Sequence, residues 1–281
     1  MIEKVKNEKL EINRIMKKQF TPICAIYALL NGIYADNKKT ISKSKFKKIA
    51  KEIWKLAICE DDLPSEEPFV SDDLIYSLIG EFFNSKQLYK FLKDKKDKIN
   101  KLLKIYNITG VEKLSLNSNS DVLSYDSITN GLKNIKKNEL YLIPFNASSP
   151  DSENNFHWIS FGKLKDGKLS IFNSNDEAMK NVLNNSCIKC SSKPPRIKNL
   201  DDLVKVYREM LRFDRDDKEC SKEVRKFDFQ KWAKNKKWLD CIIRCYPSEV
   251  RKRIENLKKG SYNCSFSKSS FEIIKVTYEK E

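Results

Sequence analysis

The chain has 281 residues, and its 55 basic and 39 acidic side chains give a formal net charge of +16. Only seven glycines are present, where about 7% of residues is usual, and they do not cluster. This scarcity argues against nucleotide-binding enzymes that use a Gly-rich phosphate loop. The single histidine excludes His-rich metal sites and two-His zinc proteases.

The apolar pattern predicts mainly helices first and strands afterwards. Helices are expected over residues 3–17, 24–31, 45–56, 72–83 and 86–106, and strands over 139–145, 156–164 and 168–173. Further helices are expected over 200–213, 229–245 and 248–259, with a last strand over 271–278. This order favours an α+β fold with an antiparallel sheet.

The composition changes near residue 177, because Arg14 is the only arginine before that point and eight follow it. We expect a catalytic domain over residues 1–176. We expect a basic, mainly helical extension over 177–281, which could pack on that domain, complete it, or form an arm that contacts the substrate or a target protein.

The chain shows no targeting or membrane signal. Its longest apolar run has seven residues, far fewer than the ~20 that cross a bilayer, and the first residues lack a secretory pattern. We expect a cytoplasmic monomer without a membrane span, or an effector that acts in a host cytoplasm.

Eight cysteines without a secretory signal indicate reduced thiols rather than a disulfide framework. Cys187, Cys190, Cys241 and Cys245 have a spacing that suits zinc. The second pair falls in a predicted helix, where cysteines usually pack as small apolar residues. We therefore expect no metal and no other cofactor.

A helix start precedes one cysteine. Thr21 is a good N-cap and Pro22 suits the first helical position, so Cys24 falls in the first turn. Unpaired backbone N–H groups and the helix dipole favour a thiolate there. Gly32 is expected to end this helix.

The only histidine, His157, is the natural partner for a thiol nucleophile. The hairpin that follows it decides which residue orients the imidazole. A two-residue Asp166-Gly167 loop places Asp176 across from His157. A three-residue loop with Gly167 left-handed places Asn173 diagonal to His157 and gathers one apolar face, so Asn173 is favoured and Asp176 is kept in reserve.

Gln19 lies five residues before Cys24 and has a side-chain amide that suits an oxyanion hole. Gln, Cys, His and Asn in this order form a papain-type constellation. The stretches KKQFTPICAIYALLNGIYAD and HWISFGKLKDGKLSIFNSN resemble the cysteine and histidine boxes of the Josephin deubiquitinases. FVSDDLIYSLIGEFF and ELYLIPF resemble the elements between these boxes.

The resemblance implies a papain-like thiol protease that cleaves isopeptide or peptide bonds after the C-terminus of ubiquitin or a ubiquitin-like protein. Cys24 matches the nucleophile, His157 the base, Asn173 its orienter and Gln19 the oxyanion residue. Trp158 and Phe156 are candidates for the substrate cleft.

Other functions remain open. A leader-peptidase-like protease shares the Gln-to-Cys offset, and a glutamine deamidase or transglutaminase toxin uses the same thioester chemistry. The non-enzyme alternative is a basic module that binds nucleic acid or a membrane surface through the C-terminal region. As the partner of the main function we expect a ubiquitin conjugate rather than nucleic acid.

Overall fold

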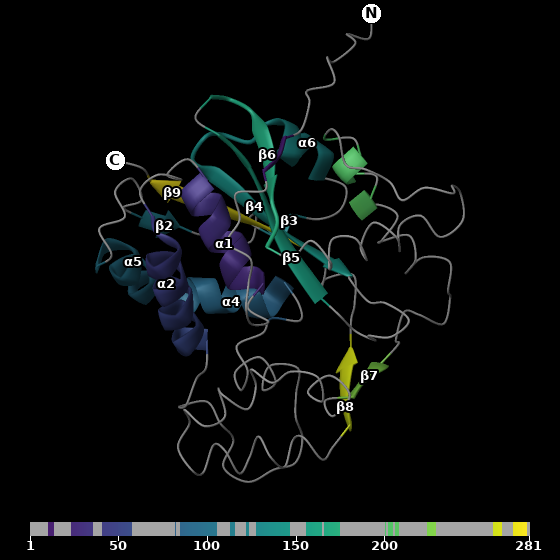
Figure 1. Cartoon of the computed structure of the whole chain (residues 1–281). Helices are drawn as coiled ribbons and strands as arrows, with labels where there is room; N and C mark the ends of the chain where they lie inside the picture. Colours follow the sequence, from purple (N-terminus) through teal and green to yellow (C-terminus); the bar gives the residue numbers. More distant parts are fainter. Residues whose placement is uncertain are drawn as a thin grey trace, which may run out of the picture.

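Helix α1 lies against a mainly antiparallel sheet in the computed structural model of the chain (Figure 1). The structure describes residues 11–13, 24–35, 41–57, 82, 85–105, 113–115, 122–123, 128–146, 156–164, 166–174, 200, 202–204, 206–207, 224–228, 261–265 and 272–279. The helices are α1 (Cys24–Tyr34), α2 (Lys43–Ala57), α4 (Ser85–Asp94), α5 (Lys96–Ile105) and α6 (Ile128–Lys133). This mixture of helices and antiparallel strands confirms the predicted α+β class.

The main sheet joins strands from both ends of the chain. Its strands are β1 (Glu11–Asn13), β2 (Lys113–Ser115), β3 (Val122–Leu123), β4 (Glu139–Asn146), β5 (Phe156–Lys163), β6 (Leu169–Phe172) and β9 (Ile273–Glu279). Within the described ranges their order is β1-β6-β5-β4-β9-β2, and β3 also pairs with β9. The strand β9, from the region beyond residue 177, therefore lies in the same sheet as the hairpin that carries His157.

Two more strands form a ribbon of their own, β7 (Val224–Asp228) with β8 (Ser261–Ser265). The sequence predicted none of the short elements β2, β3, α6, β7 and β8. Each has two to six residues, which is too short for an apolar period to show.

Two helix predictions were wrong in part. Residues 11–13 of the helix predicted over 3–17 form strand β1, which pairs in parallel with the outer edge of β6. Pairing with an open strand edge overrides a weak local helix pattern. The helix predicted over 86–106 is interrupted by a turn at Lys95, which separates α4 from α5. The predicted helices over 229–245 and 248–259 lie outside the described residues, as does all of 72–83 except Phe82.

Helix α1 is buried on every side, as its nearly continuous apolar sequence requires. Ser160 on β5 donates a hydrogen bond of 2.7 Å to the carbonyl oxygen of Ala28. On another side, the ring of Tyr27 meets Phe46 of α2 edge to face, with centroids 5.3 Å apart. The helix is thus held between the sheet and α2. None of the helices described here is long and apolar enough to span a membrane.

Gly32 does not end α1, contrary to the sequence prediction, because the helix continues to Tyr34. The helix passes very close to the sheet at this point. A Cβ atom on Gly32 would lie 2.7 Å from Leu140 Cδ2 and 3.0 Å from Ser160 Oγ. The glycine therefore serves close packing against the Leu140 and Ser160 side chains rather than a helix stop.

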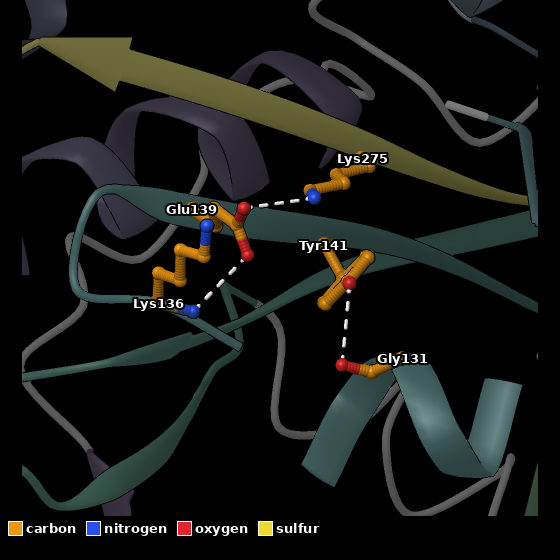
Figure 2. A network of polar contacts seen from close by, with 5 residues as sticks. All are labelled: Gly131, Lys136, Glu139, Tyr141 and Lys275. Carbon is orange, nitrogen blue, oxygen red and sulfur yellow. Dashed lines mark hydrogen bonds and ion pairs between the residues drawn. The ribbon is translucent and has the colours of Figure 1, made fainter. Parts of the chain in front are cut away.

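Successive side chains along a strand point to opposite faces of the sheet, and the two faces contact different elements. Leu140 and Ser160 face α1. On the opposite face, the Tyr141 hydroxyl donates a hydrogen bond of 3.2 Å to the carbonyl oxygen of Gly131 in α6 (Figure 2). Phe145 on that same face packs edge to face on Tyr207, with ring centroids 5.9 Å apart.

A polar network fixes the start of β4 to β9. The carboxylate of Glu139 forms an ion pair of 2.8 Å with Lys275 and accepts a hydrogen bond of 3.0 Å from the backbone N–H of Lys136 (Figure 2). Glu139 is buried, and both of its carboxylate oxygens have partners. A buried carboxylate satisfied in this way fixes the register of the two strands.

Substitution of Gly32 by Ala is expected to lower the free energy of unfolding by about 1–3 kcal/mol, measured by urea denaturation. The added methyl group collides with Leu140, and this outweighs the gain in helix propensity. Adding Leu140→Val to the same variant should restore part of the loss, with Leu140→Val alone as the control. A stabilised Gly32→Ala protein would contradict the close packing.

Candidate active site

The hairpin after His157 has the three-residue loop that the sequence favoured. Leu164 N–H donates to the carbonyl oxygen of Lys168 at 2.8 Å, and Gly167 N–H donates to that of Leu164 at 2.9 Å. Gly167 has a φ of 86°, in the left-handed region that favours glycine. The strand register, with Phe161 opposite Ile171, continues the same pairing and confirms this prediction.

This register brings His157 and Asn173 together. The distance from His157 Nε2 to Asn173 Oδ1 is 2.7 Å, and both residues are buried, with 1% and 5% of their surface exposed. The two-residue loop that would have placed Asp176 opposite His157 is not formed. Asp176 itself lies outside the described residues.

Burial determines the charge of the imidazole. Loss of water lowers the pKa of His157 to about 4, and the hydrogen bond to Asn173 opposes this shift only in part. The ring is therefore neutral at pH 7. Because Asn173 Oδ1 is an acceptor, Nε2 carries the proton and donates it, which leaves a lone pair on Nδ1.

Cys24 is the first residue of α1 and carries a buried thiol that is not part of a disulfide. The direction of α1 follows from its contacts. Ala28 lies at Ser160, whereas Gly32, one turn later, lies against Leu140, which pairs with Gly162 further along β5, and Ala35 belongs to the small apolar cluster of Leu164 and Phe172. With a rise of about 1.5 Å per helical residue and about 3.3 Å per strand residue, Cys24 lies near the end of β5 that carries His157.

The thiol and the imidazole approach this end from different faces of the sheet. His157 and Ser160 are three residues apart on β5, so their side chains project to opposite faces, and α1 lies on the Ser160 face. The structure thus joins His157 to Asn173 directly and places Cys24 at the same end of the strand. A direct contact between the Cys24 sulfur and the imidazole would have to be made past the end of β5, because the two groups lie on opposite faces of the sheet.

The remaining predicted site residues have different outcomes. Trp158 is fully buried, and its indole N–H donates to the carbonyl oxygen of Phe82 at 3.1 Å. It is therefore a core residue here and not part of an open cleft. Phe156 is the first residue of β5, and Gln19 lies outside the described residues.

The four cysteines with zinc-like spacing, Cys187, Cys190, Cys241 and Cys245, also lie outside the described residues. Among the residues that are described, no group of three or more His, Cys, Asp or Glu side chains is placed to hold a metal ion.

Sequence reasoning missed Ser160, whose hydroxyl group attaches α1 to β5 and so sets the position of Cys24. A serine inside an apolar strand was the only available signal. The partner of that hydroxyl group depends on how the helix packs, which no local pattern shows.

No protein-family model, no curated protein and no solved structure matches this chain. The features that bear on function are the positions of His157, Asn173 and Cys24 and the sequence stretches that contain them.

The buried neutral histidine predicts a loss of stability in weak acid. Between pH 6.5 and 4 the unfolded chain binds a proton at His157 and the folded chain does not, so the free energy of unfolding falls as the pH falls. From pH 7 to 5 this contribution is about 2 kcal/mol. Urea denaturation at pH 7 and pH 5 measures the free energy of unfolding. Between these pH values, wild type should lose about 2 kcal/mol more of it than His157→Gln. Equal losses in the two proteins would contradict a buried neutral imidazole.

Proposed function

We propose that this chain is a papain-like cysteine protease in which Cys24 is the nucleophile, His157 the general base and Asn173 the residue that orients the base. The observation that carries the proposal is the buried hydrogen bond of 2.7 Å between His157 and Asn173. It holds the imidazole in the tautomer with a lone pair on Nδ1, which is the form that accepts a proton from a thiol.

The position of Cys24 gives separate support. As the first residue of a helix it lies where backbone N–H groups have no acceptor within the helix itself, and the helix dipole places partial positive charge near its sulfur. Both effects lower the energy of the thiolate. The attachment of α1 through Ser160 holds this sulfur at the His157 end of β5.

In the proposed reaction, His157 Nδ1 accepts the thiol proton while Sγ of Cys24 attacks the substrate carbonyl carbon. The resulting oxyanion accepts hydrogen bonds from the backbone N–H of Cys24 and from the Gln19 amide. The imidazolium returns the proton to the amine nitrogen, the C–N bond breaks and a thioester remains. Water then attacks the thioester with His157 as base, and the acid product leaves as the thiol re-forms.

The proposed substrate is an isopeptide or peptide bond at the C-terminus of ubiquitin or a ubiquitin-like protein. Its support is the resemblance of the stretches around Cys24 and His157 to the two boxes of the Josephin family. The same thioester allows two other outcomes, cleavage of another protein and deamidation or transamidation of glutamine. The substrate is thus the part of the proposal that a covalent probe tests.

A ubiquitin derivative with a C-terminal propargyl group should form a covalent adduct with the wild-type chain, detected by intact mass. Cys24→Ala should form no adduct, because the attacking sulfur is absent. Cys264→Ala, which removes a cysteine in β8, is the matched control and should react like wild type. No adduct with wild type would contradict ubiquitin as the substrate, and an adduct in Cys24→Ala would contradict Cys24 as the nucleophile.

The hairpin register predicts which polar residue matters for turnover. Asn173→Ala should lower kcat partially, because the imidazole loses its orienting hydrogen bond but keeps its lone pair. Turnover by this variant should stay above that of Cys24→Ala. Asp176→Ala is the comparison and should stay near wild type in steady-state assays. A larger loss in Asp176→Ala than in Asn173→Ala would show that Asp176 is the orienting residue.

A further inference from the structure

One end of the sheet face that carries His157 is covered by a segment from the C-terminal third of the chain. Phe145 on β4 pairs directly with His157 on β5, so the two side chains project from the same face. Tyr207 packs edge to face on Phe145, with ring centroids 5.9 Å apart and the planes at 86°. Phe145 therefore lies beside His157 on this face and is packed against Tyr207.

The segment around Tyr207 is part of the main core. Residues 200, 202–204, 206 and 207 are helical. Leu203, Val206 and Tyr207 are 1–3% exposed and belong to the same apolar cluster as Phe145. The segment therefore packs in the core on this face of the sheet. In Figure 1 it is drawn as the short green pieces that carry no label.

The other element on this face lies too far along the strand to cover His157. Helix α6 is attached at Tyr141, which pairs with Phe161. Tyr141 and Phe145 are four strand residues apart, or about 13 Å. At the His157 end of this face, Tyr207 packs on Phe145.

We propose that Tyr207 is a positioning residue of the candidate site, which shields the His157–Asn173 hydrogen bond from water by packing on Phe145. Phe145, Asn173 and Tyr207 are all uncharged at neutral pH, and water competes for this hydrogen bond wherever it reaches the pair. A hydrogen bond is stronger where water is excluded, and a shielded imidazole keeps one orientation and one tautomer. The catalytic consequence rests on the proposed function, but the shielding itself does not.

The experiment is an NMR titration of the His157 ring, whose signal needs no assignment because the chain has one histidine. Wild type should titrate with a pKa of about 4. In Tyr207→Ala, water reaches the ring, and the pKa should rise by about one or more towards the ordinary value of 6.5. Tyr207→Phe keeps the ring contact and should match wild type. Tyr207→Leu, a milder change in case the Ala variant does not fold, should lie between them.

Tyr34→Ala is the matched control, because Tyr34 also packs edge to face on a phenylalanine, at the far end of α1. It should leave the pKa of His157 at the wild-type value. An unchanged pKa in both Tyr207→Ala and Tyr207→Leu, or a wild-type pKa near 6.5, would overturn the proposal. An equal shift in Tyr34→Ala would overturn it as well, because the effect would then be general loosening.

These outcomes are separate from those of the covalent probe. If wild type forms no adduct but Tyr207→Ala raises the pKa of His157, the proposed function is wrong and the shielding by Tyr207 is supported. If wild type forms the adduct but the pKa of His157 is unchanged in Tyr207→Ala, the proposed function is supported and the shielding by Tyr207 is wrong. Where both hold, Tyr207→Ala should lower kcat with little change in KM, whereas Tyr207→Phe should not.

Discussion

A single strand register determines which polar groups of this protein meet. The loop before Lys168 makes β6 pair with β5 so that Ile171 lies opposite Phe161 and Asn173 lies diagonal to His157. A slip of one residue would send Asn173 to the face covered by α1 and leave the imidazole without its partner. It would also move Leu169 and Ile171 away from the apolar face that they share with Ile159. Burial of apolar side chains therefore enforces the alignment of the polar pair.

The second constraint is the burial of α1 from end to end. A helix without charged residues is driven into the interior, and its backbone then approaches the sheet so closely that a side chain on Gly32 would displace Leu140. The hydroxyl group of Ser160 bonds to a helix carbonyl and fixes the helix along β5. As a result Cys24, the first residue of α1, lies near the end of β5 that carries His157. The Cys24 thiol and the His157 imidazole therefore lie toward the same end of β5 but on opposite faces of the sheet.

Local patterns predicted the parts of the site that depend on neighbouring residues. The helix beginning at Cys24 and the Gly167 turn follow from short signals, and the turn was enough to single out Asn173. Sequence reasoning failed where distant segments meet. Gly32 resembled a helix stop because the sheet behind it was unknown, and the first residues looked helical because the open edge of β6 was unknown. Trp158 looked like a cleft residue because the carbonyl group of Phe82 that receives its N–H is distant in sequence.

The position of β9 has a consequence for how the protein is made. This strand pairs with β4, yet residues 147–272 separate the two in the chain. A ribosome therefore releases β4 and the His157 hairpin long before their neighbour exists, and during that time one edge of β4 is open to other strands. Contacts of such large sequence separation also slow folding. An open strand edge is a general aggregation risk, and for β4 this edge is closed by β9 only when residues 273–279 have been made.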